Sequence, residues 1–69
     1  MPYPRDERQA LEQERDELLA QIAADQRELA ATTDQDRTRR EFLAWRIKRA
    51  QNRITFIEIR LAAIRIEAP

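Results

Sequence analysis

The feature that most constrains this chain is its lack of residues that interrupt a helix. None of its 69 residues is glycine, and the three prolines stand at positions 2, 4 and 69. Glycine and proline are the residues that a helix interior tolerates least, so nothing between residues 5 and 68 forbids helix. A phosphate-cradling loop needs glycine, which excludes the common nucleotide-binding loops. We therefore expect an all-α fold.

A first helix is expected over residues 5–31. Pro4 occupies the place of a first helical residue, where its missing N–H would have no partner within the helix. Apolar side chains recur at helical spacing along one narrow stripe, which Leu19 widens and which Arg15 and Asp25 interrupt. The members of this stripe are Leu11, Leu18, Ile22 and Leu29.

Residues 32–34 are expected to form a tight turn. Thr32, Thr33 and Asp34 are all residue types that cap the start of a helix. Thr33 and Asp36 also have the spacing of a capping box, in which two side chains bond to backbone N–H groups at a helix start. A second helix is therefore expected over residues 34–67, and residues 1–69 form a single antiparallel hairpin.

The second helix carries an uninterrupted apolar seam. Its spacing alternates between four and three, the period of a coiled coil, and its phase differs from that of the first helix. The change of phase supports a break, although one continuous helix with a stutter is the alternative architecture. Residues 54–61 also alternate between apolar and polar side chains, and taken alone they could form a strand. The seam consists of Leu43, Ile47, Ala50, Ile54, Ile57, Leu61, Ile64 and Ala68.

Charge divides the chain in two. Residues 1–36 carry ten acidic and four basic side chains, whereas residues 37–69 carry nine basic and three acidic ones. In an antiparallel hairpin the acids beside the first seam face the bases beside the second, so we expect ion pairs that select orientation and register. The acids are Glu14, Glu17, Asp25 and Glu28, and the bases are Arg39, Arg46, Arg49, Arg53 and Arg60.

The two seams also predict a register, in which Ile22 packs near Leu43. The pairs expected from this register are Leu18 with Ile47, Leu11 with Ile54, Glu17 with Arg46 or Arg49, and Glu14 with Arg49 or Arg53. The alternative interpretation of the arginine-rich side of the second helix is a nucleic-acid-binding surface.

A second apolar face is expected on the second helix, opposite its seam. A helix that is apolar on two sides needs two neighbours. The apolar residues 54–66 also lie opposite the polar residues 5–9, so one hairpin is not expected to bury its own C-terminal half. We expect two hairpins to associate through this face into a four-helix assembly, with part of the face as an alternative groove for a target helix. The predicted dimer interface is Trp45, Phe56, Ile59, Ala63 and Ile66.

Four residues near the ends of the hairpin are candidates for contact with another protein. Trp, Tyr and Arg are enriched at the energetic centres of protein interfaces. The candidates are Tyr3, Arg5, Phe42 and Trp45. Lys48, the one lysine, is expected to be a solvated surface residue.

Catalytic, cofactor-binding and metal-binding residues are not expected. The chain has no Cys and no His, and Thr32 and Thr33 have no base beside them that could activate a nucleophile. The acidic cluster of Glu12, Glu14, Asp16 and Glu17 is typical of a solvated helix face. The formal net charge is zero, which gives no attraction to nucleic acid or to anionic membranes. No apolar run spans a bilayer and no signal peptide is visible.

The size, the two-helix plan and the arginine content resemble those of small phage-encoded anti-activators, which bind bacterial quorum-sensing regulators of the LuxR type. The resemblance implies a homodimer that blocks a host protein in the bacterial cytoplasm and, for one such protein, also acts on a type IV pilus assembly ATPase. Twelve arginines against one lysine indicate GC-rich coding, which agrees with a bacterial or phage source. We expect a non-enzymatic protein-binding regulator, with a nucleic-acid-binding hairpin dimer or a purely structural assembly subunit as alternatives.

Overall fold

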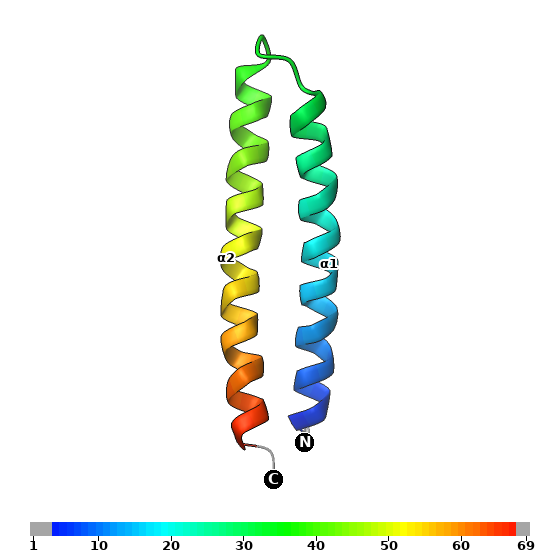
Figure 1. Cartoon of the computed structure of the whole chain (residues 1–69), viewed down its shortest axis with the longest axis vertical. Coiled ribbons are helices and arrows are strands. Elements are labelled where there is room, and N and C mark those ends of the chain that lie inside the picture. The colour runs from blue at the N-terminus through cyan, green and yellow to red at the C-terminus, as the bar shows by residue number, and fades with distance from the viewer. Residues whose placement is uncertain (1–3, 68–69) are drawn as a thin grey trace.

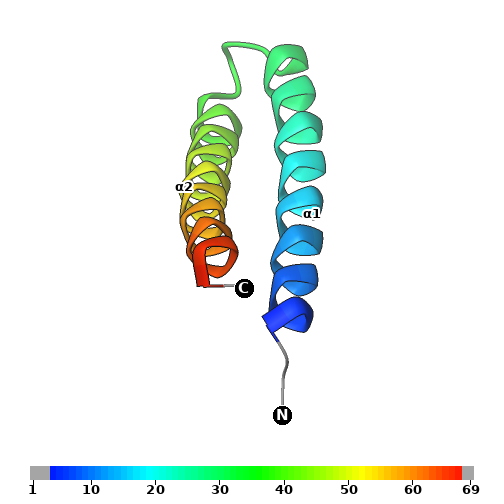
Figure 2. The ribbon, with the colours of Figure 1, turned by 60° about the horizontal axis from the view of Figure 1, so that its bottom comes forward.

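The chain forms an elongated hairpin of two helices. The computed structural model describes the backbone of residues 4–67 and the side chains of residues 7–66. Helix α1 (Pro4–Ala31) and helix α2 (Arg37–Glu67) lie side by side in opposite directions along their whole lengths, and the molecule measures 54 × 17 × 14 Å (Figures 1 and 2). The expected all-α hairpin is confirmed. A single continuous helix is excluded, and residues 54–61 are helical rather than a strand.

Helix α1 begins at Pro4, as its sequence predicts, and it ends without a glycine cap. The hydroxyl of Thr32 donates a hydrogen bond to the carbonyl of Glu28 at 2.7 Å. The guanidinium of Arg40 then donates from Nη1 to the carbonyls of Leu29, at 3.3 Å, and Thr32, at 2.9 Å. Side chains thus bond to the carbonyls of Glu28 and Leu29 in the last turn of α1, and the backbone N–H of Thr32 also donates to that of Leu29 at 3.3 Å. In glycine-capped helices, backbone N–H groups bond to these last carbonyls.

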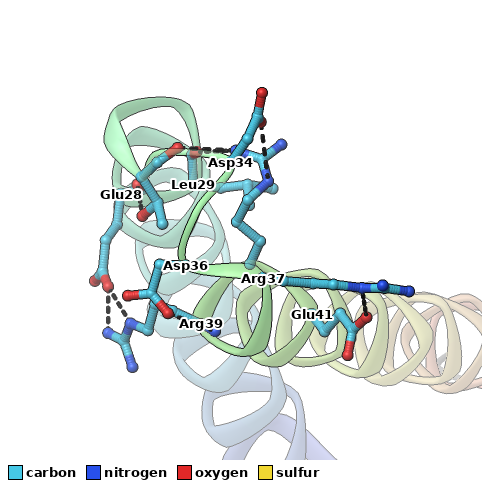
Figure 3. Close-up of polar contacts among 9 residues, drawn as sticks. Glu28, Leu29, Asp34, Asp36, Arg37, Arg39 and Glu41 are labelled. Atoms are coloured by element: carbon cyan, nitrogen blue, oxygen red, sulfur yellow. Dashed lines mark hydrogen bonds and ion pairs between the residues drawn. The ribbon is translucent and has the colours of Figure 1, made fainter.

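The turn is longer than the sequence predicts, because it extends over residues 32–36 and α2 begins at Arg37. The expected caps Thr32, Thr33 and Asp34 are wrong. Asp36 is the N-cap, since its Oδ1 accepts a hydrogen bond from the backbone N–H of Arg39 at 3.3 Å (Figure 3). The additional residues are needed to cross between the two helix ends. No residue of the described backbone has a positive φ, so this turn has no position that favours glycine.

The predicted seam of α2 forms the core. Leu43 and Ile57 have no exposed surface, and Leu61 is half-buried, whereas Ala68 lies outside the described residues. Helix α1 contributes less, since only Ile22 of its stripe is buried and Leu19 is exposed. The remaining buried seam residues of α2 are Ile47, Ala50, Ile54 and Ile64.

The predicted register is confirmed in part, since Glu14 pairs with Arg53 and Leu18 packs against the buried cluster that contains Ile47. Ile22 belongs to a buried cluster whose members on α2 all come after Leu43, its predicted neighbour. Leu11, which was expected to pack with Ile54, is not packed against this cluster. The cluster consists of Ile22, Ile47, Ala50 and Ile54, with Leu18 and Leu29 packed against it.

The expectation that one hairpin leaves the C-terminal half of α2 uncovered is wrong for the seam, although Phe56, Ile59 and Ile66 of the second face do stay exposed. Ile57 and Ile64 are buried within the single hairpin. An ion pair between Glu7 and Arg60 holds the first turns of α1 beside this part of α2. The half-buried side chain of Arg15 on α1 can cover apolar surface with its aliphatic stem while its charged end stays in water.

Candidate interaction surface

A ladder of ion pairs runs along one edge of the interface between α1 and α2. Its four arginines follow one another on α2 at intervals of seven residues, so they lie on one side of the seam. The pairs are Arg39–Glu28, Arg46–Asp25, Arg53–Glu14 and Arg60–Glu7. The ladder confirms that these arginines bind acids of α1, and Figure 3 shows its rung at the turn, Arg39 with Glu28.

Two rungs of the ladder have bidentate geometry. Arg53 donates to the two carboxylate oxygens of Glu14 at 2.7 and 3.0 Å, and Arg60 donates to those of Glu7 at 2.7 and 3.2 Å. Such paired, charge-assisted bonds favour the ionised carboxylate. They hold the pKa of Glu14 and of Glu7 below the ordinary value of 4.5 and raise the pKa of Arg53.

The ladder has one irregular rung, at Arg46. The acids Glu7, Glu14 and Glu28 lie at multiples of seven, but the position between the last two holds Gln21. Arg46 turns instead to Asp25, where its Nε lies 3.0 Å from Oδ2. Asp25 is 6% exposed. Its Oδ2 takes part in this ion pair but accepts no hydrogen bond among the described residues. The ladder therefore places a buried carboxylate within the apolar stripe of α1.

The predicted partners of Glu17 are wrong. Glu17 is in none of the ion pairs between residues 7 and 66, and it accepts a hydrogen bond from Gln13 on its own helix. Arg49, one of the two partners expected for it, lies with its guanidinium over the ring of Trp45, 5.3 Å from the centroid. Glu7 was missed, although it lies seven residues before Glu14 and this spacing could have identified it.

The arginines of α2 also lie against aromatic rings. Besides the contact of Arg49 with Trp45, the guanidinium of Arg39 lies 5.5 Å from the ring centroid of Phe42, and that of Arg53 lies 5.3 Å from that of Phe56. Cations over aromatic faces are attracted by the negative charge of the ring face. Arg39 and Arg53 thus join an acid of α1 to an exposed ring of α2.

The second face of α2 is exposed in the hairpin, as the sequence predicts. Trp45 is 55% exposed, Phe56 59%, Ile59 65% and Ile66 83%, while Ala63 is half-buried. The seam on the opposite side of the same helix is buried, so these side chains are not the hairpin's own core. They form a strip that a partner could cover.

Two of the four candidate partner-binding residues lie together. The rings of Phe42 and Trp45 have centroids 6.3 Å apart and planes tilted by 33°. Tyr3 and the side chain of Arg5 lie outside the described residues. Sequence reasoning did not anticipate a shallow hollow beside Trp45, which is lined also by Lys48, Arg49 and Asn52. The spacing of four between Trp45 and Arg49 was the available signal for it, because residues four apart are neighbours on a helix.

The acidic cluster of α1 is occupied by contacts within the hairpin. Glu12 pairs with Arg8, Asp16 pairs with Arg15, and Glu14 belongs to the ladder. Across the described residues, no group of three or more His, Cys, Asp or Glu side chains could hold a metal ion. In the same part of the chain, neither helix has a stretch apolar and long enough to cross a bilayer.

Among the described residues, the second face of α2 is therefore an apolar surface that the hairpin leaves uncovered. Comparison of the chain with protein-family models, with curated proteins and with solved structures finds no match. The interpretation of this surface consequently rests on the residues themselves.

Proposed function

We propose that the chain is a non-enzymatic protein-binding regulator that acts as a homodimer. The observation that carries this proposal is the exposed second face of α2. Burial of a side chain such as Phe56 or Ile59 contributes about 1.5–3 kcal/mol, and a contiguous exposed apolar strip marks an interaction surface.

The C-terminal half of this face suits a second copy of the chain. Phe56, Ile59, Ala63 and Ile66 are spaced by three, four and three residues, the spacing of a coiled-coil seam. A two-fold axis would bring this seam against the same seam of another hairpin, which buries both at once and gives a four-helix assembly. Small domains without disulfides or metals commonly gain stability in this way.

Sedimentation equilibrium of single substitutions tests the dimer. Phe56→Asp and Ile59→Asp place a charge on the strip and are expected to give monomers. Gln51→Asp is the matched control, because Gln51 is an exposed residue of α2 away from the strip, and it should stay dimeric. Circular dichroism confirms that each variant keeps its helices. A wild-type monomer at micromolar concentration, or a dimeric Ile59→Asp variant, contradicts the assignment.

For the target we propose a host protein such as a LuxR-type transcriptional regulator, with a pilus assembly ATPase as a further target. The support for this choice is the resemblance in size and two-helix plan. The chain would act by occluding or destabilising the active dimer of the regulator, in the cytoplasm of a bacterial host.

A pull-down from bacterial lysate at low and high salt, with mass spectrometry and a nucleic-acid assay of the eluate, tests this choice. Retention of one protein at high salt supports an inhibitor or adaptor. Recovery of nucleic acid that is lost at high salt contradicts it, because phosphate binding weakens steeply with salt.

A further inference from the structure

The second face of α2 changes its chemistry along the helix. Its C-terminal half, from Phe56 to Ile66, is apolar. Its N-terminal half, from Phe42 to Asn52, combines two aromatic rings with cations and an amide. A uniform homodimer contact would not need this division, so the two halves call for separate explanations.

The N-terminal half has a defined geometry. Phe42 and Trp45 pack against each other, and a guanidinium lies over each ring, Arg39 over Phe42 and Arg49 over Trp45. Beside Trp45 is the hollow that Lys48, Arg49 and Asn52 complete. Its lining therefore offers two cations, a side-chain amide and the edge of a large exposed indole.

The positive charge of this hollow is not balanced within the hairpin. The four arginines of the ladder have acidic partners on α1. Among the residues whose side chains the structure describes, neither Lys48 nor Arg49 forms an ion pair, and no acid lines the hollow. The ladder thus uses acids of α1 and leaves an uncompensated cationic site on the outer side of α2.

We propose that this hollow, which we call the cationic-aromatic site (Trp45, Lys48, Arg49 and Asn52, with Phe42 beside it), binds an acidic segment of a partner protein. The segment's carboxylates would meet Lys48 and Arg49, and an apolar side chain would cover Trp45. This inference rests on the proposed function as a protein-binding regulator. It assigns Trp45, which the sequence also placed in the dimer interface, to the half of the face that a dimer contact through residues 56–66 leaves open. Complementary charge favours encounter and selects partners, while the buried aromatic residue supplies affinity.

A protein segment fits this site better than a nucleic acid. Proteins that bind single strands follow the backbone along a positively charged groove and stack successive bases on aromatic side chains, whereas this hollow is short and is lined by one ring, two cations and an amide.

The test is selection from a display library of random 12-residue peptides on the full chain, followed by titration of the selected peptides. Trp45 is the one tryptophan, so its emission reports directly on coverage of the site. We expect selected peptides to be enriched in Asp and Glu around an apolar residue, and to shift the emission of Trp45 to shorter wavelength with saturation.

Two double variants with the same change of net charge locate the binding. Lys48→Glu/Arg49→Glu should weaken the selected peptides at least tenfold. Arg27→Glu/Arg65→Glu alters two exposed arginines away from the site and should change the affinity less than twofold. The inference is overturned if acids are not enriched, if both variants lose affinity equally, or if a single-stranded oligonucleotide binds more tightly than the peptides and depends on Lys48 and Arg49.

Sedimentation of the same samples separates this inference from the dimer. A wild-type monomer that binds acidic peptides refutes the dimer and leaves the cationic-aromatic site standing. A Lys48→Glu/Arg49→Glu variant that stays dimeric and binds the peptides as well as the wild type refutes the cationic-aromatic site and leaves the dimer standing.

Discussion

Replacing Asp25 with leucine is expected to stabilise the hairpin, although the substitution removes an ion pair. The Asp25 carboxylate is buried within the apolar stripe of α1, and its contact with Arg46 is its one ion pair among the described residues. The side chain of Arg46 is 43% exposed, so it returns to water easily when its partner is removed. The buried carboxylate pays a desolvation penalty that a leucine would not.

The size of the effect follows from these burials. A leucine buried at position 25 contributes about 1.5–3 kcal/mol, and the half-exposed ion pair that is lost contributes about 1 kcal/mol or less. The Asp25→Leu variant should therefore be more stable than the wild type by about 0.5–3 kcal/mol. Arg46→Met should have the opposite effect, a loss of about 1–3 kcal/mol, because it leaves Asp25 buried without its partner.

Urea unfolding followed by circular dichroism at 222 nm measures both substitutions and their combination in a double-mutant cycle. All variants are compared at one protein concentration, because self-association adds a concentration-dependent contribution to stability. The double variant should regain most of the stability that Arg46→Met loses. An Asp25→Leu variant less stable than the wild type would refute the reasoning, since it would mean that the ion pair outweighs the burial of a leucine.

Three further predictions use the same assay. Acid should destabilise the hairpin below about pH 4.5. The pKa values of Glu7 and Glu14 are lowered in the folded state, so the folded state binds fewer protons than the unfolded state, and this contribution to stability is complete above that pH. The Glu7→Gln/Glu14→Gln variant should lose less stability on acidification. Ile57→Ala should lose about 2–5 kcal/mol, since Ile57 is fully buried, and a loss below about 1 kcal/mol would exclude it from the core. Asp36→Ala should lose about 0.5–2 kcal/mol as an N-cap, whereas Gln35→Ala, a control at an exposed residue of the same turn, should stay within about 0.5 kcal/mol of the wild type.

The seam of α2 could be predicted residue by residue because its alternation of four and three is uninterrupted. From Leu43 to Ile64 every predicted position is buried or half-buried. The side on which the ladder lies was also predictable, since Arg39, Arg46, Arg53 and Arg60 keep one place in the heptad. Periodicity thus determined which faces meet.

The register could be predicted only in part, because sliding one helix along the other by a turn still brings apolar residues together. The register also depends on where the turn ends and α2 begins. Residues 32–36 contain four side chains that can cap a helix, so several starting points are open. Asp36 caps α2, and Arg40 donates a hydrogen bond to the carbonyl of Thr32 at the end of α1. No periodic pattern in the sequence identifies Arg40 for this contact.

The candidate site was predicted in part for a related reason. The exposed strip of α2 follows from its apolar spacing, and Phe42 and Trp45 stand out by residue type. The cationic-aromatic site could not be predicted, because Arg49 was expected to form ion pairs with α1. At about 100° per residue, Arg49 lies only about 40–60° around the helix from Arg46 and Arg53. Charge and residue type alone do not resolve whether an arginine at such a position faces the neighbouring helix or an outer ring.

The rungs of the ladder close loops of very different size. Glu28 and Arg39 are 11 residues apart in the chain, Glu14 and Arg53 are 39 apart, and Glu7 and Arg60 are 53 apart. The entropy lost on closing a loop grows with its length, so the rung at the turn forms most readily and each later rung depends on those before it. Loop-closure entropy therefore favours a hairpin that closes from the turn, and we expect the rung between Glu7 and Arg60 to open before the rung between Glu28 and Arg39.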